Sequence, residues 1–390
     1  MTRRRVAIGV LLLFAAATWV LVGRLHGHTV RAVHAPNHGR DFDFRDPPCR
    51  PLDRPEVGEG DLLLRSLGVS GLYVEWRGGA LLFGPYFSRV SLLSAGFGRI
   101  VLDREAIARG LDGLPLDRVH AVLVGHAHYD HLADLPVVLA EHVPGASVLV
   151  NRTGAHILAA FPDVRGHVIE LEPREKHWIR LIDRRGSEFP VRVLPIASSH
   201  ADHFAGYHYA PGEVVAPWTT WNDKGHPDMR EGLPFAFLVD FLDADGSPAF
   251  RLHYQDTASD APLGFPPPEA IAERPVDLAV TCMPSSWRAR DYPRGVLERT
   301  RAAHVLVLHY EDFFRTLDRP LRFVGALTDR RAATFLEAVR VEMALPRHAP
   351  AGPEPFACGP GGSAWSMPLP GEWLRFRTDT PRSRVILPPQ

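Results

Sequence analysis

Three histidines and an aspartate crowd into the segment HAHYDH, directly after the apolar run VHAVLVG at residues 119–125. His126 and His128 alternate along the chain, so their rings can face one metal ion. Asp130 and His131 begin the next turn and can face a second ion. Because neutral imidazole and carboxylate are both good ligands for Zn²⁺, this spacing behind a strand predicts a metal site.

The elements that must hold these residues are short apolar runs alternating with helix-like stretches. We expect strands at residues 119–125, 147–150, 191–198, 235–241, 250–256, 276–282 and 304–310. We expect helices at residues 131–143, 154–161 and 329–343. Gly78-Gly79 and Asp245-Gly246 each indicate a hairpin turn. Near-continuous apolar strands mixed with helices favour an α/β fold in which helices cover the sheets.

The H-x-H-x-D-H motif and the chain from about residue 72 to residue 314 resemble the metallo-β-lactamase superfamily. The resemblance implies a four-layer αββα sandwich with metals at one edge, between the two sheets. It also implies three further ligands after later strands, and candidates stand there: His200 ends VLPIASSH, Asp256 follows RLHYQ, and His309 lies in VLVLHYEDFF.

This resemblance divides the ligands between two metals: His126, His128 and His200 at the first, Asp130, His131 and His309 at the second, and Asp256 bridging both. Alternatives remain for two of them. His203 could replace His200, although His200 stands where the strand stops. Asp260 could replace Asp256, although only Asp256 ends a strand. His253 is read as a strand side chain without metal, and His304 as lying at the strand end opposite His309.

The implied cofactors are two Zn²⁺ ions, which iron or manganese could replace. The implied reaction is hydrolysis by a metal-bridged hydroxide, with Asp130 accepting its hydrogen bond and Asp256 as the second catalytic carboxylate. His128 in place of Glu argues against the di-iron redox branch. Asp256, where the main zinc β-lactamases use Cys, argues against antibiotic hydrolysis.

Within the superfamily, GHAHYDHLADLP and HYEDFF look most like the branch of N-acyl-phosphatidylethanolamine-hydrolysing phospholipase D, which cleaves phosphodiesters. One departure is that LLFGPYFS lacks the Asp-Pro usual after the early hairpin. The expected substrate is therefore a phosphodiester, including a phospholipid. The alternatives are a lactone, acyl ester or amide hydrolase, and a non-enzymatic metal-binding protein.

A long loop at residues 207–232 follows the third histidine and carries several aromatic side chains. A loop of this length beside a site is expected to form a substrate wall; a solvent-facing insertion is the alternative. His226 or Tyr310 could donate a proton to the leaving group.

The remaining expectations concern partners and placement. The formal net charge of −1 leaves no basic footprint for nucleic acid, so a small molecule or lipid is expected as substrate, and the oligomeric state is not predicted. Arg3, Arg4 and Arg5 precede an apolar stretch at residues 6–23, which predicts an uncleaved anchor with the rest exported; a cleaved signal peptide is the alternative. The expected organisation is a signal segment (1–23), a linker (24–60), the hydrolase domain (61–345) and a C-terminal extension packed on it (346–390).

Three cysteines are present and none forms a C-x-x-C pair, which argues against a thiolate zinc site. Cys49 and Cys358 could form a disulfide in an oxidising compartment, or remain unpaired. Cys282 ends an apolar run and is expected to be buried as a small hydrophobic residue.

Overall fold

The computed structural model describes residues 33–35, 40–42, 54, 58, 60–165, 168–182, 186, 188–203, 206–319, 321–325, 327–345 and 365–378. The expected anchor at residues 6–23, most of the expected linker, and Cys49 and Cys358 lie outside this part of the chain. Among the described residues, no helix combines the length and apolar composition needed to cross a bilayer.

Two seven-stranded sheets form the centre of the molecule. The first has the order β16-β3-β4-β5-β6-β7-β8 and the second the order β15-β14-β13-β12-β11-β10-β9. The strands of the first sheet are β3 (Asp61–Gly68), β4 (Gly71–Trp76), β5 (Gly79–Phe83), β6 (Val119–Leu123), β7 (Ser147–Val150), β8 (Val168–Glu170) and β16 (Trp373–Arg377). Those of the second are β9 (Ile179–Ile182), β10 (Glu188–Ala197), β11 (Phe235–Leu242), β12 (Pro248–Tyr254), β13 (Leu278–Cys282), β14 (His304–Leu308) and β15 (Trp365–Ser366). A separate antiparallel pair joins β1 (Val33–Ala35) and β2 (Arg40–Phe42).

Both sheets have the same pairing pattern. The strands β16, β3, β4 and β5 pair antiparallel, and β5 to β8 pair parallel. In the second sheet β9 to β12 pair antiparallel and β12 to β15 pair parallel. Because parallel strands end at the same edge of a sheet, the loops after β6, β12 and β14 can contribute to one site.

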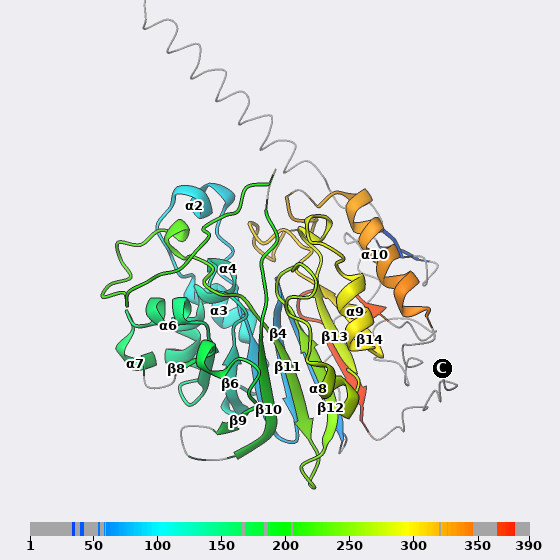
Figure 1. Ribbon diagram of the computed structural model, residues 1–390. Helices are drawn as coiled ribbons and strands as arrows, with labels where there is room; N and C mark the ends of the chain where they lie inside the picture. Colours follow the sequence, from blue (N-terminus) through cyan, green and yellow to red (C-terminus); the bar gives the residue numbers. More distant parts are fainter. Residues whose placement is uncertain are drawn as a thin grey trace, which may run out of the picture.

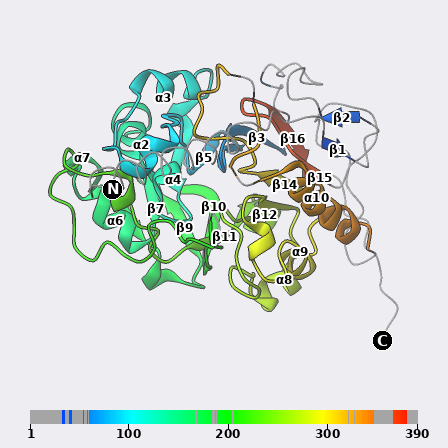
Figure 2. The same ribbon diagram turned by 90° about the horizontal axis from the view of Figure 1, so that it is seen from above.

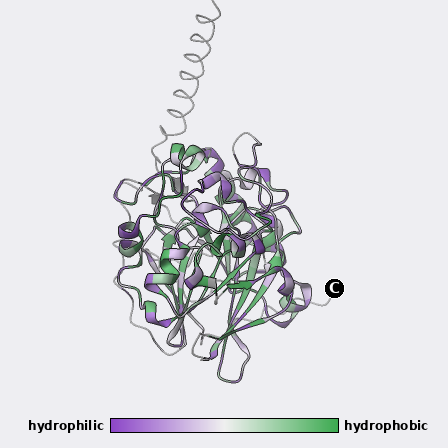
Figure 3. Cartoon of the chain, turned by 90° about the vertical axis from the view of Figure 1, so that its left-hand side faces the viewer, coloured by the Kyte–Doolittle hydropathy of each residue, from purple (hydrophilic) through white to green (hydrophobic). Residues whose placement is uncertain are grey.

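Alternation along the strands separates an inner core, between the sheets, from an outer apolar cluster beneath the helices. On β4, Leu72, Val74 and Trp76 belong to the apolar cluster shared by the two sheets. Tyr73 points the other way, into the cluster beneath the helices. A strand whose two faces are both buried reads as a continuous apolar run, which explains why the sequence shows little polar alternation here. Figure 3 shows these hydrophobic strands inside a more hydrophilic outer layer.

Helices cover the outer faces of both sheets, so the expected αββα sandwich is confirmed (Figures 1 and 2). The first side carries α2 (Leu92–Phe97), α3 (Arg104–Leu111), α4 (Tyr129–Leu132), α6 (Arg152–Leu158) and α7 (Pro162–Arg165). The three-residue helix α5 (Leu135–Val137) follows α4 along the chain. The second side carries α8 (Pro268–Glu273), α9 (Arg294–Thr300) and α10 (Asp329–Met343). Short helical turns are η1 (Leu116–Arg118), η2 (Val138–His142), η3 (Glu172–Arg174), η4 (His226–Asp228) and η5 (Ser286–Arg288).

Several boundaries differ from the sequence-based expectation. The first hairpin turns at Arg77-Gly78, whose φ angles are 45° and 82°, one residue before the expected Gly78-Gly79. The helix expected at residues 131–143 is divided into α4, α5 and a π-helical turn, η2. Asp134 lies at the first break, where its side chain accepts hydrogen bonds from the backbone of Phe87 and Ser88. The hairpin at Asp245-Gly246 is confirmed.

The C-terminal segment contributes a strand to each sheet. β15 pairs parallel with β14, and β16 pairs antiparallel with β3. Both edge strands are short, and each lies far along the chain from the strand with which it pairs, so no local sequence pattern reveals them.

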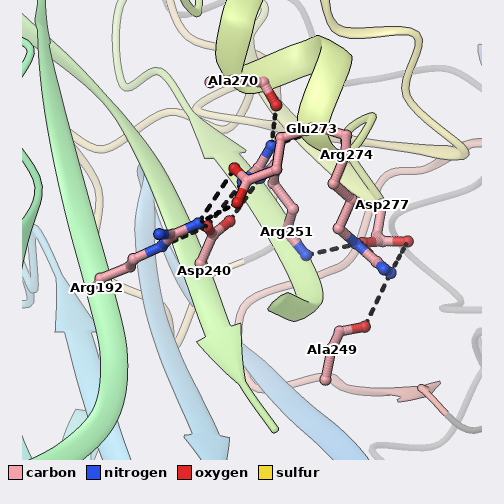
Figure 4. A network of polar contacts seen from close by, with 8 residues as sticks. All are labelled: Arg192, Asp240, Ala249, Arg251, Ala270, Glu273, Arg274 and Asp277. Atoms are coloured by element: carbon pink, nitrogen blue, oxygen red, sulfur yellow. Dashed lines mark hydrogen bonds and ion pairs between the residues drawn. The ribbon is translucent and has the colours of Figure 1, made fainter. Parts of the chain in front are cut away.

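A buried ion network fastens α8 to the outer face of the second sheet (Figure 4). Arg251 is completely buried and binds Asp240 through two hydrogen bonds of 2.5 and 2.8 Å. It also reaches Glu273 on α8 at 2.8 Å, and Arg192 binds both carboxylates. Because every buried charge here has a partner, the network orients α8 without leaving a charge unpaired.

Candidate metal centre

The structure brings together all seven residues that the sequence analysis proposed as ligands. Each follows the end of a strand: the four residues of HAHYDH follow β6, His200 follows β10, Asp256 follows β12 and His309 follows β14. Their ligand atoms fall into three overlapping groups whose members lie within 4.8 Å of one another: His126, His128 and His200; His126, His131 and Asp256; Asp130, His131 and His309.

The first group consists of three imidazoles in mutual contact. The ring centroids of His126 and His128 are 4.7 Å apart, and His200 lies 4.9 Å from His126 and 5.1 Å from His128. All three pairs meet edge to face, at 71° to 82°. This arrangement gives three nitrogen donors converging from two strand ends, which suits one face of a tetrahedral Zn²⁺ site.

The other two groups each add one carboxylate, Asp256 in one and Asp130 in the other. Asp130 Oδ2 lies 3.3 Å from His309 Nε2 and 3.5 Å from His131 Nε2. Asp256 lies between the groups, with Oδ1 3.1 Å from His126 Nδ1 and Oδ2 3.7 Å from His131 Nδ1. Asp256 is thus the carboxylate that touches residues of both groups, the position expected of a bridging ligand.

Hydrogen bonds leave one nitrogen of each ring in the first group available. His128 Nε2 lies 3.4 Å from the Ala210 carbonyl, and His200 Nδ1 lies 2.7 Å from the Ala201 carbonyl. Each of these bonds fixes a proton on that nitrogen and leaves a lone pair on the other. His126 Nε2 is buried and has no hydrogen-bond partner among the described residues. Nitrogen lone pairs within a buried cluster can bind a cation, and an imidazole must be neutral to offer such a lone pair.

The charge states of the cluster also fit a cation. Burial, joined by the neighbouring histidines, lowers the pKa of His128 and His200 well below the ordinary value and that of His131 to about 4. For Asp130 and Asp256, burial alone would raise the pKa, but the histidines around them outweigh it and the pKa of both carboxyls is lowered. Near neutral pH these three imidazoles are therefore neutral and both carboxylates ionised, as metal ligation requires. His126 differs, because burial alone would lower its pKa but the adjacent Asp256 carboxylate outweighs burial and raises it.

Gly125 allows the bridging carboxylate to approach the first loop. Its backbone N–H donates to Asp256 Oδ2 at 3.0 Å. A Cβ at this position would lie 2.6 Å from Asp256 Cγ, far inside normal contact. Glycine is therefore required by the close approach, which was not predicted; its signal in the sequence is a glycine directly before the first ligand.

The structure also places the alternative residues. Asp260 accepts the Arg290 N–H at 2.7 Å and belongs to none of the candidate groups. His253 is buried within β12 with Nε2 2.9 Å from the Gly264 carbonyl, and His304 begins β14 at the end opposite His309, bonded to Ser366. This geometry agrees with the choice of Asp256 over Asp260 as the ligand. It also agrees with the expectations that His253 is a strand side chain and that His304 lies at the strand end opposite His309.

His203 does not displace His200 but stacks on it, with ring centroids 4.4 Å apart. It forms a fourth group with His200 and His208. His208 binds Glu231 at 2.7 Å through Nε2 and Asp202 at 3.3 Å through Nδ1, so both of its nitrogens have partners. His203 Nδ1 accepts the backbone N–H of Tyr209 at 3.1 Å. The sequence indicates His203 only as an alternative ligand, because its place beside the cluster depends on how the loop after β10 folds back.

A cavity of about 370 Å³ opens beside the cluster. Tyr207 and Tyr209 line it, so the beginning of the 207–232 loop forms part of its wall, as expected. His226 is buried against Tyr129 instead, and the Tyr310 hydroxyl donates to the Pro368 carbonyl at 2.7 Å. Neither residue is among those lining the cavity, so the structure does not support the suggested proton transfer from either. Cys282 is buried at the end of β13, as predicted.

Comparisons with known proteins give a likeness in structure alone. No family model matches the chain, and no curated protein matches it. Igni18, a metallo hydrolase from Ignicoccus hospitalis, is 14% identical, with 81% of this chain and 98% of that chain covered and a TM-score of 0.44. CmlA, a diiron β-hydroxylase from Streptomyces venezuelae, is 14% identical, covering 74% and 52%, with a TM-score of 0.44. YhfI from Bacillus subtilis, a metallo-β-lactamase fold protein, is 12% identical, covering 64% and 86%, with a TM-score of 0.37.

The phospholipase D-like branch is not confirmed by these likenesses and stays a prediction. The two sheets, their outer helices and the cluster at the strand ends agree with the sequence-based resemblance. The chain therefore has the αββα sandwich fold that the resemblance of its sequence to the metallo-β-lactamase superfamily implies.

Proposed function

We propose that the chain is a hydrolase that uses two divalent cations, zinc being the expected pair, to cleave phosphodiesters. The observation that carries this proposal is the cluster of seven buried or half-buried His and Asp side chains, gathered from four strand ends beside a cavity. Degenerate relatives would be expected to lose ligands, whereas a candidate stands at each of the seven positions here. The likeness of GHAHYDHLADLP and HYEDFF to the phospholipase D-like branch favours a phosphodiester as the bond cleaved.

The proposed ligands are His126, His128 and His200 for one cation and Asp130, His131 and His309 for the other, with Asp256 shared. Divalent cations supply Lewis acidity, which makes water nucleophilic near neutral pH and neutralises charge developing on the substrate. Asp130 Oδ2 lies within 3.5 Å of two imidazoles, and Asp130 also lines the cavity. Its carboxylate can therefore accept a hydrogen bond from the attacking water and orient it.

His203 supplies a hydrogen-bond donor on the cavity wall. Because its Nδ1 accepts the Tyr209 N–H, the neutral ring carries its proton on Nε2. The ring lines the cavity and lies 5.5 Å from His128, centroid to centroid. His203 can thus donate a hydrogen bond to a substrate oxygen while the other residues of the cluster hold the cations.

Turnover of bis(p-nitrophenyl) phosphate tests the proposal, with the full chain loaded separately with Zn²⁺, Mn²⁺ and Fe²⁺. We expect hydrolysis with at least one metal and a loss of roughly 10²-fold or more in Asp256→Asn, because it removes a charge from a ligand position. Asp260→Asn is the matched control, since Asp260 lies four residues further on and outside the cluster. No turnover of this ester or of any phospholipid would refute the phosphodiester assignment.

A panel of lactones, acyl esters and amides on the same preparation separates the alternative hydrolase functions. Activity on this panel without phosphodiester turnover would support the metal centre. It would also show that the bond cleaved is that of a lactone, an acyl ester or an amide and not that of a phosphodiester. A metal-loaded protein inert on every substrate of both panels would instead favour a non-enzymatic metal-binding role.

A further inference from the structure

The wall of the cavity beside the metal centre is largely apolar. On one side lie Leu92, Ala95 and Gly96 of α2. On the other lie Trp287 and the segment after β14, with side chains contributed by Phe313, Phe314, Val324 and Leu327. The polar side chains lining it belong chiefly to the cluster and its neighbours, among them His128, Asp130, His200, His203, Asp256 and His309.

Phe313 and Phe314, which follow His309 in the sequence, both line the cavity. The Phe313 ring contacts His309, with centroids 5.0 Å apart, and Phe314 packs on Phe313 at 4.6 Å. On the facing wall the Tyr209 hydroxyl donates to the Ala95 carbonyl at 2.7 Å, which ties α2 to the 207–232 loop. Both walls are therefore held by contacts of their own and form a preshaped apolar space next to the reacting centre.

From this arrangement we propose that the cavity binds one apolar substituent of the substrate, an alkyl chain or an aryl group carried on the scissile phosphoester, which rests on the function proposed above. A volume of about 370 Å³ lies near the lower end of the range for small-molecule sites, ~300–1,000 Å³. That space fits a single chain rather than a pair of acyl chains. The substrate class is thus a phosphodiester or related anion with one apolar arm directed between α2 and Phe313.

Apolar side chains continue onto the surface near the cavity. Leu93 and Phe97 of α2 are 64% and 91% exposed, and Tyr207, which also lines the cavity, is 65% exposed. An apolar arm can therefore enter either from free solution or from a lipid aggregate. The chemistry of the ligand is the same in both cases, and the experiment separates the two sources.

Gly96 provides a way to fill the cavity without disturbing the core. It lies in α2, lines the cavity, and a Cβ built on it meets no atom within 4 Å. Gly96→Trp should therefore fold and reduce the space for the apolar arm, with Gly96→Leu as a smaller substitution if the tryptophan variant does not fold. Gly145→Trp is the matched control, because a Cβ on Gly145 also meets nothing within 4 Å and Gly145 is not among the cavity residues.

The measurement is calorimetric binding of methyl-, butyl- and octylphosphonate to the metal-loaded full chain, which requires no turnover. Each buried methylene should tighten binding about fourfold, so octylphosphonate, which has four more methylenes, should bind roughly 250-fold more tightly than butylphosphonate. We expect Gly96→Trp to lose this dependence on chain length and to keep the affinity for methylphosphonate. Gly145→Trp should behave like the unsubstituted protein.

An affinity independent of chain length in the unsubstituted protein, or a dependence unchanged in the folded Gly96 variants, would overturn the proposal. Chain-length dependence without phosphodiester turnover would support the cavity and refute the hydrolase substrate, so the two failures are distinguishable. Binding of dissolved octylphosphonate supports a free amphiphile, and binding only when it is carried in phosphatidylcholine vesicles supports a bilayer lipid. Binding in neither arm overturns the proposal.

Discussion

Replacement of Gly125 by alanine should weaken metal binding through one carboxylate, although residue 125 is not itself a ligand. The alanine Cβ would lie 2.6 Å from Asp256 Cγ, whereas real Cβ contacts essentially never fall below 3.0 Å. Because Gly125 belongs to the backbone that leads from β6 into HAHYDH, the carboxylate is the group that must retreat. Its retreat breaks the 3.0 Å hydrogen bond from the Gly125 N–H and moves Asp256 away from His126.

The magnitude follows from the bond that is lost. A hydrogen bond to a charged group contributes roughly 1.5–3 kcal/mol. Since about 1.4 kcal/mol corresponds to a tenfold change in an equilibrium constant, we expect metal affinity to fall about 10- to 100-fold. The same range applies to residues that orient metal ligands without binding the metal.

The assay is competition for Zn²⁺ between the metal-free protein and a chromophoric chelator, with thermal unfolding of the metal-free protein as a check on folding. Gly145→Ala is the control, because a Cβ there meets no atom within 4 Å. Unchanged zinc affinity in a correctly folded Gly125→Ala protein would refute the reasoning, since it would mean that the position of Asp256 does not matter to the metal.

Three further predictions concern the rest of the chain. Arg251→Met should destabilise the protein by about 3 kcal/mol in urea unfolding, because Asp240 keeps only Arg192 as a buried partner. Burial lowers the pKa of His253 to about 4, so the unfolded chain takes up a proton below about pH 6.5 that the folded chain does not, and the free energy of unfolding falls as the pH drops through that window. His253→Gln should remove roughly 3 kcal/mol of that fall between pH 7 and pH 4; an unchanged pH profile would contradict it. Deletion of residues 1–23 should move the protein from the membrane to the soluble fraction, and an unchanged distribution would contradict the proposed anchor.

Much of the architecture can be predicted from the sequence, because strands that are buried on both faces appear there as continuous apolar runs. The apolar runs at residues 147–150, 235–241 and 276–282 became β7, β11 and β13 with nearly the expected bounds. The expected helix at residues 329–343 became α10 with the same bounds. Both outcomes depend on local patterning and on the capping of α10 by the Thr328 side chain.

The elements that the sequence did not reveal depend on distant contacts. β16 forms only by pairing with β3, which lies roughly three hundred residues earlier, and no local pattern records that pairing. The division of the helix at residues 131–143 reflects Asp134 binding the backbone of Phe87 and Ser88, again a long-range contact. Pro136, in the first turn of α5, is in addition a local signal against a continuous helix, and the expectation for residues 131–143 overlooked it.

The candidate site divides in the same way. The ligand types and their places after strands could be read from HAHYDH and from the ends of later apolar runs. The contributions of Gly125, His203 and the apolar walls could not, because each depends on which loops meet across the edge of the sandwich. The spacing of residues in the sequence indicates which side chains can bind a metal ion. The contacts between loops determine which other residues surround those side chains.

The most direct test of the paired-cation centre is the metal content of the purified full chain, measured by inductively coupled plasma mass spectrometry. We predict two equivalents of a divalent transition metal per chain, falling to one in His200→Ala and in His309→Ala, which each remove a ligand from a different group. Protein free of bound transition metal after purification and after incubation with Zn²⁺, Mn²⁺ or Fe²⁺ would contradict the account.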